Sequence, residues 1–322
     1  MTSKQKTNKI LSADDASIEL AVSAIKAGKL IGLPTETVYG LAANALDDTT
    51  VFNVFKAKER PSFNPLIVHV ADVNMARELA EVSLLAEKLM LAFWPGPLTL
   101  VLKLKPNNPL SSLVTAGLDS VALRSPNHPI ALKLLERGKL PLAAPSANKS
   151  GTISPTTAAH VVDGLGEKIA YVLDGGACTV GLESTIISLT NDQVSILRPG
   201  AITAEMVKSV TGQTVTENTK PQSIEAITAP GQLESHYAPN NNLRLNASSA
   251  NEGEFLLGFG NIKGHTSLSP NGNVDEAAKN LFAMLRVADS KTKDGIAIAP
   301  IPNEGMGIAI NDRIKRAAAP KS

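Results

Sequence analysis

The fold class of this chain is decided by residues 30–40, which read Leu-Ile-Gly-Leu-Pro-Thr-Glu-Thr-Val-Tyr-Gly. The apolar run 30–34 predicts a buried strand. Directly after it, residues 35–39 offer two hydroxyls, a carboxylate and an aromatic ring. Open α/β sheets bind ligands beyond the carboxyl ends of their strands, so this stretch predicts an α/β fold with a polar site there. An ordinary strand-end turn is the alternative interpretation.

The segments around this strand alternate between helical and extended patterns. Ser12 and Asp15 have the spacing of a capping box, which predicts a helix over residues 13–28. Ser154 followed by Pro155 predicts a further helix start. More strands are expected at residues 66–70, 98–104, 121–124, 140–144, 169–173, 185–189 and 194–197. Such strand–helix alternation is typical of α/β proteins.

The composition changes after about residue 212. Residues 213–242 are polar, contain several prolines and asparagines and show no hydrophobic period, which predicts an interdomain linker. The alternation then returns, with strands expected at 243–245, 254–259 and 295–299 and helices near 274–289 and 306–318. We therefore expect a large α/β domain at residues 1–212 and a small one at residues 243–322.

The overall composition limits the function classes. The chain has 322 residues, of which 43% are hydrophobic and 19% charged, as expected of a globular protein. Its 31 Lys and Arg nearly balance 30 Asp and Glu, which disfavours a DNA-coating protein or a polybasic membrane binder. The single cysteine, Cys178, excludes a disulfide framework within the chain and a cysteine-based zinc site. It also lacks the partner pattern of a nucleophile, so we expect an incidental thiol.

The sequence predicts neither a secretory signal nor a membrane span. The first nine residues are polar and have no apolar core. The most apolar stretch, residues 84–104, is interrupted by charges, prolines and a glycine. We therefore expect a cytoplasmic protein without a membrane partner.

A second polar segment, residues 56–69, begins with three cations within five residues. Lys56, Lys58 and Arg60 lie at a predicted helix end, where the helix dipole alone favours cations. The extended Arg-Pro-x-x-Asn-Pro pattern that follows fits simple capping less well, and lysine and arginine together suit a phosphate group. His69, inside the strand 66–70, suits either a ligand contact or a core position.

Two more polar segments follow buried strands. Residues 144–155 combine small residues and hydroxyls ahead of a helix N-terminus, which attracts anions but also occurs in generic loops. Residues 175–187 and 197–200 add Ser184 and Arg198 at strand ends. The chain has no Walker-type phosphate loop and no histidine pair at metal spacing. Together, the segments predict a cleft lined by hydroxyls and cations, suited to a phosphorylated ligand and a small polar molecule.

Eight ordered motifs over roughly residues 15–212 resemble the threonylcarbamoyl-adenylate synthase family, built on the YrdC-type domain. They are Pro34-Thr-Glu-Thr-Val-Tyr-Gly-Leu41, Lys58-Glu-Arg-Pro61, Asn64-Pro-Leu-Ile-Val-His69, Trp94-Pro-Gly-Pro-Leu-Thr99, Ala122-Leu-Arg-Ser-Pro126, Ala144-Pro-Ser-Ala-Asn148, Glu183-Ser-Thr-Ile186 and Leu197-Arg-Pro-Gly200. Two later segments, 230–239 and 305–317, resemble the linker and the end of the second domain in the longer members.

The resemblance implies a fold and an activity. The implied fold is a twisted, open, mixed α/β sheet with a positively charged cleft, joined to a smaller Rossmann-like C-terminal α/β domain by a linker that folds across the cleft. The implied enzyme makes L-threonylcarbamoyl-AMP and pyrophosphate from L-threonine, bicarbonate or CO2, and ATP with Mg2+. A downstream tRNA threonylcarbamoyl transferase complex would use the product to modify the adenosine next to the anticodon.

The resemblance also implies roles for single residues. Lys58 and Arg60 are the expected catalytic groups. Residues expected to contact ATP are Lys58, Arg60, Asn64, Ser120, Ser146, Asn148, Ser154, Arg198, His236 and Tyr237. Residues expected to contact L-threonine are Thr37, His69, Arg124, Ala144 and Ser184, with Thr35 as the alternative to Thr37. No protein ligand is expected for the metal, since Mg2+ would arrive on the phosphates.

Two other function classes remain open at this stage. The same cleft could hold RNA, and weak RNA binding stays possible, although the low aromatic content of 3% and the near-neutral charge disfavour it as the main role. A carbamoyl-adenylate enzyme of hydrogenase maturation uses a related domain. That family adds acylphosphatase and zinc-finger segments, which a chain with one cysteine cannot supply.

Overall fold

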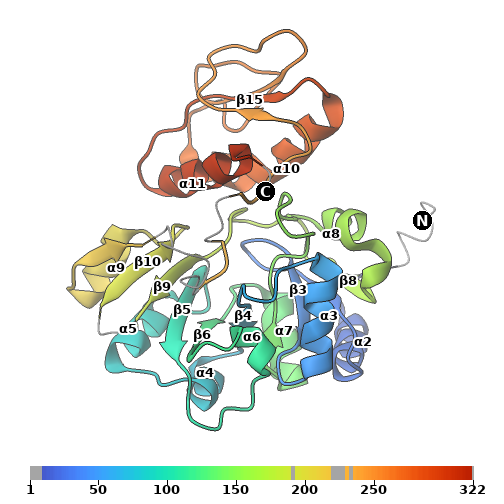
Figure 1. The fold of residues 1–322 in the computed structure, drawn as a ribbon, viewed down its shortest axis with the longest axis vertical. Helices are drawn as coiled ribbons and strands as arrows, with labels where there is room; N and C mark the ends of the chain where they lie inside the picture. Colours follow the sequence, from blue (N-terminus) through green and yellow to red (C-terminus); the bar gives the residue numbers. More distant parts are fainter. Residues whose placement is uncertain (1–8, 190–192, 219–228, 232–234, 321–322) are drawn as a thin grey trace.

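We describe a computed structural model that covers residues 9–189, 193–218, 229–231 and 235–320. Figure 1 shows a larger α/β unit and, above it, a smaller one. The larger unit contains an 11-stranded sheet of order β1-β8-β2-β3-β7-β4-β6-β5-β9-β10-β11, and the smaller a 4-stranded sheet of order β12-β15-β13-β14. No helix in the described ranges is long and apolar enough to cross a membrane.

The larger sheet is mixed, with both parallel and antiparallel neighbours. Its strands are β1 (Ile10–Leu11), β2 (Ile31–Leu33), β3 (Gly40–Asn44), β4 (Ile67–His69), β5 (Leu98–Lys103), β6 (Ser120–Arg124), β7 (Leu142–Ala143), β8 (Tyr171–Leu173), β9 (Thr185–Ser188), β10 (Val194–Arg198) and β11 (Val215–Glu217). Strand β4 runs parallel to β6 and antiparallel to β7, while β2 runs antiparallel to β3. This arrangement confirms the predicted mixed α/β fold.

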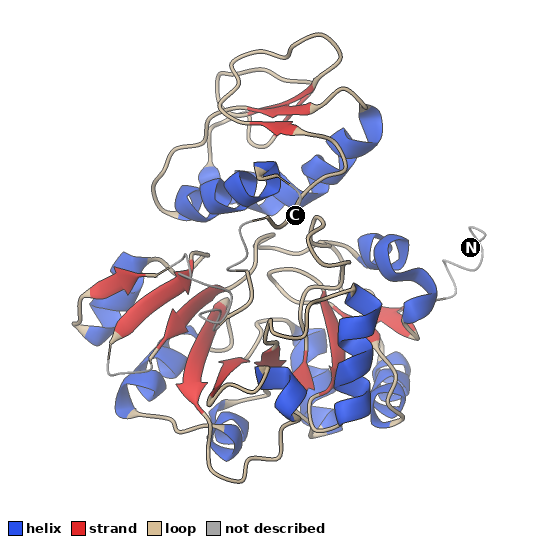
Figure 2. Cartoon of the chain, viewed as in Figure 1, coloured by secondary structure: helices blue, strands red, loops and turns tan. Residues whose placement is uncertain are grey.

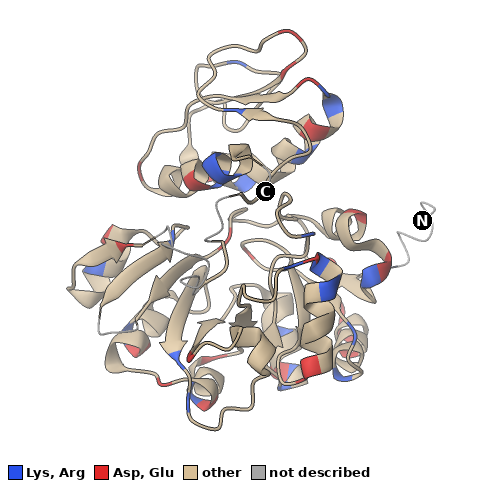
Figure 3. Ribbon diagram, viewed as in Figure 1, with Lys and Arg blue, Asp and Glu red and all other residues tan. Residues whose placement is uncertain are grey.

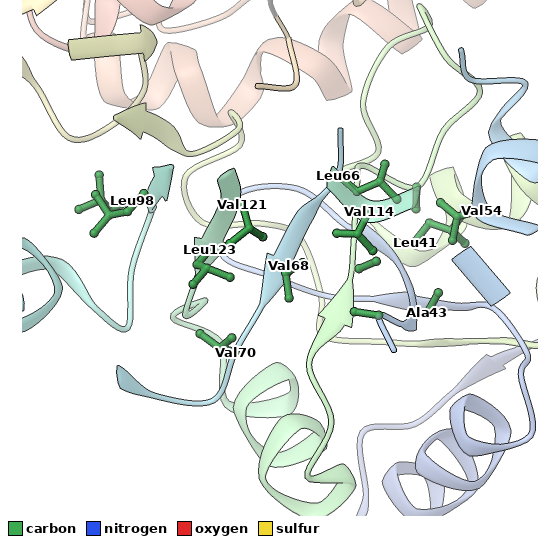
Figure 4. Packing of buried hydrophobic residues seen from close by; sticks show 14 of the residues in the cluster. Leu41, Ala43, Val54, Leu66, Val68, Val70, Leu98, Val114, Val121 and Leu123 are labelled. Carbon is green, nitrogen blue, oxygen red and sulfur yellow. The ribbon is translucent and has the colours of Figure 1, made fainter. Parts of the chain in front are cut away.

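Helices cover the larger sheet on both faces (Figure 2). They are α2 (Asp15–Lys26), α3 (Asp48–Lys58), α4 (Val73–Leu79), α5 (Leu84–Phe93), α6 (Ser112–Thr115), α7 (Pro129–Gly138), α8 (Ala158–Leu165), the short 3-10 turn η1 (Gly166–Lys168) and α9 (Ala204–Thr211). Helices α2 and α7 pack with Ile31 and Leu33 of β2 in one apolar cluster. Figure 4 shows the opposite core, where Leu41, Val68 and Leu123 come from three different strands.

Two helix starts differ from the predicted ones because the hydroxyls expected to cap them have other partners. Helix α2 is capped by Asp14, not Ser12; the Ser12 hydroxyl instead donates to the Asp14 carboxylate. Helix α8 is capped by Thr157, three residues later than the predicted Ser154. The Ser154 hydroxyl is used elsewhere, since it donates to Glu183 Oε1 over 2.5 Å.

The start of the expected linker belongs to the larger sheet. Strand β11 runs parallel to β10, with Val215 opposite Val194. This strand has three residues and only one half-buried side chain, so it shows no hydrophobic periodicity and could not be predicted from the sequence. The remaining described linker residues are 229–231 and 235–242.

The smaller unit has a parallel sheet, as the Rossmann-like expectation requires. Its elements are β12 (Leu243–Arg244), β13 (Phe255–Gly258), β14 (Thr266–Ser267), α10 (Val274–Lys291), β15 (Ile296–Ile298) and α11 (Met306–Ala318). Figure 1 shows α10 and α11 on the side of this unit that faces the larger one.

The two units share a core. Val38, Ile153 and Leu182 of the larger unit and Tyr237 of the linker pack in one cluster with the apolar residues of α10 and α11. Gly181 approaches α10 so closely that a Cβ atom there would lie 2.5 Å from the Cα atom of Lys279. The units therefore meet through close packing of buried groups.

Candidate active site

A cavity lies where the carboxyl ends of β4 and β6 face the linker. Its volume is about 40 Å³, which is room for only a few water molecules. The described lining residues are Thr37, Val38, Gly40, Arg60, Ile67, His69, Arg124, Ala144, Pro145, Ser146, Glu183, Ser184, Arg198, Pro230, Gly231, His236 and Tyr237. They come from the larger unit and the linker.

Three polar side chains at strand ends, Thr37, His69 and Arg124, form one side of the cavity, which we call the strand wall. The parallel register of β4 and β6 places His69 opposite Arg124. Arg124 donates from Nη1 to Thr37 Oγ1 over 2.8 Å and from Nε to the Gly96 carbonyl over 3.1 Å. Its Nη2 atom lies 2.7 Å from Glu36 Oε2, an ion pair without the alignment of a hydrogen bond. The guanidinium is thereby fixed at the cavity edge.

The two threonines of the first polar loop have different positions. Thr37 lines the cavity and accepts from Arg124. Thr35 lies behind it, with its hydroxyl 2.6 Å from the Val38 carbonyl and 2.9 Å from Thr37 Oγ1. Thr37 is therefore the hydroxyl available to a ligand, and Thr35 supports it.

The imidazole of His69 is buried and neutral. Burial, reinforced by the neighbouring positive charge of Arg124, holds its pKa well below the ordinary value. Its Nδ1 atom has no hydrogen-bond partner among the described residues. A neutral imidazole with an unused nitrogen can accept from, or donate to, a polar ligand group.

Three buried cations, Lys58, Arg60 and Arg198, gather on another side of the cavity, and we call them the cationic cluster. Lys58 ends α3, and the left-handed conformation of Glu59, with φ of 55°, turns the chain so that the Arg60 side chain is also buried. Lys58 Nζ donates to the carbonyls of Ser146 and Asn148 over 2.5 and 2.7 Å. The two guanidinium groups likewise donate mainly to uncharged carbonyl oxygens.

Neutral acceptors leave the positive charge of the cationic cluster largely uncompensated. Burial, together with the neighbouring charge of Arg60, lowers the pKa of Lys58 well below its ordinary value. Burial also lowers the pKa of Arg60, to about 10. Mutual repulsion and desolvation both disfavour three close cations, so an anionic ligand would stabilise them.

The linker closes the remaining side of the cavity with Pro230, Gly231, His236 and Tyr237, which we call the linker wall. The Tyr237 ring stacks on Phe282 of α10, with ring centroids 5.6 Å apart. The chain around it is held by backbone bonds to both units, His236 to Arg316 over 3.2 Å and Ala238 to Gly151 over 2.7 Å. The linker wall is thus anchored from two sides.

Unpaired buried polar atoms concentrate around this cavity. Among the described residues, those without a hydrogen-bond partner include Asn64 Nδ2, His69 Nδ1, Asn148 Oδ1, His236 Nδ1 and Glu36 Oε1. Buried polar atoms are normally hydrogen-bonded, and each exception calls for an explanation. A polar ligand that binds here would supply the missing partners.

Two features noted in the sequence lie outside the cavity lining. Lys56 is exposed and borders a separate surface hollow of about 640 Å³ between α2, α3 and η1. Cys178 is buried, and burial raises the pKa of its thiol to about 12, as expected of an incidental thiol.

Comparison with known proteins identifies the family. A family model described as Telomere recombination, covering the Sua5, YciO and YrdC proteins, matches residues 23–200, and one described as Threonylcarbamoyl-AMP synthase, C-terminal domain, matches residues 202–319. The chain is 39% identical over 320 residues to the threonylcarbamoyl-AMP synthase of Pyrococcus abyssi, with 94% of each chain covered. The chain belongs to the threonylcarbamoyl-AMP synthase family.

Other members of the threonylcarbamoyl-AMP synthase family agree over nearly the whole length. The enzyme of Bacillus subtilis is 38% identical over 328 residues, covering 96% of this chain and 94% of that one. The crystal structure of P. abyssi Sua5 complexed with L-threonine matches with a TM-score of 0.89 at 37% identity, covering 96% of this chain and 97% of that one. The predicted family and the predicted fold are both confirmed.

Most residues assigned by resemblance to threonylcarbamoyl-AMP synthases meet at the cavity. Those that line it are Thr37, Arg60, His69, Arg124, Ala144, Ser146, Ser184, Arg198, His236 and Tyr237. Four more touch a lining residue or one of the cationic cluster: Lys58, Asn64, Asn148 and Ser154. Their roles toward particular substrates remain predictions.

Ser120 is the exception. It starts β6 and pairs with Lys103, whereas the cavity lies at the other end of that strand, where Arg124 pairs with His69. Four residues of strand span about 13 Å. Ser120 therefore lies away from the described cavity lining, and the ATP contact expected of it stays a prediction.

Sequence reasoning gave no role to three charged residues at the site. Glu36 pairs with Arg124, and Glu183 lines the cavity. Arg313 of α11 reaches Glu183 from the other unit over 2.8 Å. Glu36 and Glu183 lie inside two of the quoted motifs, and this position could have indicated that they belong to the site. Arg313 stood inside the C-terminal motif, but nothing local placed it near the site.

The residues present do not offer a protein site for a divalent metal. No group of three or more His, Cys, Asp or Glu side chains in the described ranges could hold one. The carboxylates nearest the cavity, Glu36 and Glu183, are each paired with an arginine. The manner in which Mg2+ would bind therefore stays a prediction.

Proposed function

We propose that this chain synthesises L-threonylcarbamoyl-AMP and pyrophosphate from L-threonine, bicarbonate or CO2, and ATP. The observation that carries the proposal is one cavity with the strand wall on one side and Arg60 and Arg198 on another, with Lys58 bonded to the lining residue Ser146. The first suits a small zwitterion with a hydroxyl, and the second suits a chain of phosphates. Membership of the family and the L-threonine bound to P. abyssi Sua5 support the same assignment.

In the proposed reaction, the threonine amine adds to CO2 and loses a proton, forming a carbamate. One carbamate oxygen then bonds to the α-phosphorus of ATP, and the bond from that phosphorus to the bridging oxygen of pyrophosphate breaks. Pyrophosphate leaves with the electron pair, and a mixed anhydride remains. The chemistry needs no protein nucleophile, which suits a site without a reactive cysteine.

The residues of this chain would act by positioning and by charge. Arg124 would bind the threonine carboxylate, Thr37 and Ser184 would bind its polar groups, and His69 would remain neutral beside the amine. Lys58 and Arg60 would hold the phosphates and stabilise the charge that develops on the leaving pyrophosphate. Mg2+ would enter bound to ATP, since the described residues include no cluster of side chains that could hold it.

The proposal requires the linker wall to move. Sites for ligands of this size have volumes of roughly 300 Å³ or more, well above the 40 Å³ of the present cavity. His236 and Tyr237 occupy the side from which a nucleotide would have to enter. Their return after binding would exclude water from an anhydride that hydrolyses readily.

The fate of the product completes the proposal. The mixed anhydride would pass to a tRNA threonylcarbamoyl transferase complex in the cytoplasm. Figure 3 shows lysines and arginines intermixed with acidic residues along both units, a pattern that favours no extended RNA-binding surface. Any RNA contact would therefore be weak, and its salt dependence can be measured by gel shift.

The test is a product assay with purified full-length chain. ATP turnover is measured with and without L-threonine and bicarbonate, and the products are identified by mass spectrometry. We expect threonylcarbamoyl-AMP and pyrophosphate, formed only when both co-substrates are present. ADP and phosphate as main products would refute the proposal.

A further inference from the structure

The C-terminal unit contributes the buried side chain of Arg313 to the surroundings of the cavity. Arg313 lies on α11, and its side chain is fully shielded from solvent. It donates from Nε to Glu183 Oε2 over 2.8 Å and from Nη2 to the Pro199 carbonyl over 3.0 Å. Its guanidinium carbon also lies 5.3 Å from the centroid of the Tyr237 ring. One side chain thus contacts the larger unit and the linker wall together.

Glu183 is the partner that makes this contact relevant to the site. It is the only carboxylate among the described lining residues, and its other oxygen accepts from Ser154 over 2.5 Å. A negative charge in this position would repel phosphates held by the cationic cluster. It would also compete with the phosphates for Lys58 and Arg198. Its negative charge already acts to raise the pKa of both cations.

The surrounding charges show which group loses its partner if Arg313 is removed. Asp312 accepts from Arg313 and also from Arg316, over 2.6 and 3.0 Å. Asp312 would therefore keep a cation. Burial alone would raise the pKa of Glu183, but Arg313 foremost, with Arg198 and Ser154, holds it below the ordinary value. Glu183 is the carboxylate left without its main counter-charge.

We propose that Arg313 is a positioning residue that neutralises Glu183 from the second domain and thereby keeps the cationic cluster available to the phosphates of ATP. The inference rests on the proposed function, because it assumes that the cluster binds a nucleotide. It gives the C-terminal domain a part in substrate binding besides anchoring the linker: without Arg313, the phosphate side of the cavity carries an uncompensated carboxylate.

A purely structural clamp would use the same contacts, so the test separates charge from packing. The variants are Arg313→Met, Glu183→Gln and the double variant, each in the full-length chain. The matched control is Arg286→Met on α10. Arg286 also reaches the larger unit, donating to the Ile153 carbonyl, but it does not line the cavity.

The first measurement is the affinity of a non-hydrolysable ATP analogue by calorimetry. An unscreened like charge in a binding site costs several kcal/mol, so R313M should bind the analogue at least about tenfold more weakly. The double variant should regain most of the affinity, because Glu183→Gln removes the repelling charge. R286M should bind as the original chain does, and the KM for L-threonine should change little in R313M.

Different failures have different meanings. Unchanged analogue binding by folded R313M, or a double variant as weak as R313M, would overturn the inference and leave only a clamp. If R313M does not fold, E183Q decides alone: binding equal to or tighter than that of the original chain supports the inference, and weaker binding overturns it. An original chain that binds no analogue would instead refute the proposed function.

Discussion

The strand wall and the linker wall enclose the same cavity but are built differently. The strand wall is set by sheet register: β4 and β6 run parallel, and their pairing alone brings His69 opposite Arg124. The linker wall instead depends on partners in the C-terminal unit. Tyr237, for example, is held by Phe282 and Arg313 of the C-terminal unit. One wall is therefore formed within a single sheet, and the other only after two domains have docked.

This difference suggests how the work of the site is divided. A wall fixed by strands can hold a small substrate in a constant geometry. A wall fixed by docking can open and close, because it is stabilised by a limited set of contacts to each unit. The following experiments disturb the two walls and the cationic cluster separately, from the largest expected effect to the smallest.

The largest effect is expected at the strand wall. Arg124→Met leaves Glu36 as a buried carboxylate without its partner. Removing one member of a buried ion pair costs about 3–5 kcal/mol, so the free energy of unfolding in urea should fall by that amount. Adding Glu36→Gln should restore part of it. A loss below about 1 kcal/mol, as for exposed pairs, would show that the wall is not a rigid element.

The cationic cluster comes next. Lys58→Ala or Arg60→Ala should reduce kcat/KM by an amount equal to about 2–4 kcal/mol of transition-state stabilisation, as when a preorganised charge-stabilising group is lost. Steady-state kinetics with ATP as the varied substrate measures the loss. Near-normal turnover in both variants would show that Lys58 and Arg60 only stabilise the end of α3 and do not act in catalysis.

Removing the linker wall tests the comparison directly. A chain that ends at residue 218 keeps β11 and should fold, whereas one that ends at residue 212 loses that edge strand. The longer fragment should make product at least about tenfold more slowly, equivalent to about 1.4 kcal/mol, because nothing closes the cavity. Circular dichroism checks folding, and full activity of the fragment would contradict a closing role.

A smaller effect should appear in the pH dependence of nucleotide binding. The pKa of Lys58 lies well below its ordinary value, and a phosphate beside the amine raises it again. Binding therefore takes up protons between those two pKa values, and affinity falls as the pH rises through that interval. Calorimetry in buffers of different ionisation enthalpy measures the uptake. Lys58→Met should abolish it, and an equal uptake in that variant would assign the proton elsewhere.

The smallest effect is expected at Ser120, at the far end of β6 from the cavity. Ser120→Ala should change kcat/KM and stability by less than about 0.5 kcal/mol, as for substitutions away from special features. Thr37→Ala serves as the comparison, because it should weaken L-threonine binding measurably. A raised KM for ATP in the Ser120→Ala variant would instead support the predicted contact between Ser120 and ATP.

The sequence revealed the strand wall well for a physical reason. Polar residues such as Thr37 and Arg124 stand next to apolar strand runs, and the edge at which such strands end is where ligands bind. Family resemblance then supplied the roles that geometry alone left open, including the two residues of the linker wall. Lys58 and Arg60 were recognisable as a pair, but their burial was not, because it depends on the left-handed turn at Glu59.

What the sequence could not give were relations between distant segments. The pairing of Glu183 with Arg313 joins residues 130 positions apart, and no local pattern encodes it. Strand β11 escaped notice because it is three residues long and has no buried side chain. The place of Ser120 was also hidden, because a motif shows that a strand is near but not which of its ends faces the cavity.

Gly181 limits how closely the two units can approach each other. Its backbone has φ of 81° and lies against the backbone of α10 near Lys279, with no space for even one methyl group. Two main chains in direct contact cannot move closer, so Gly181 sets how near the two units can approach at this point. A Gly181→Ala substitution would place a methyl group between the two backbones and force the units apart at this point.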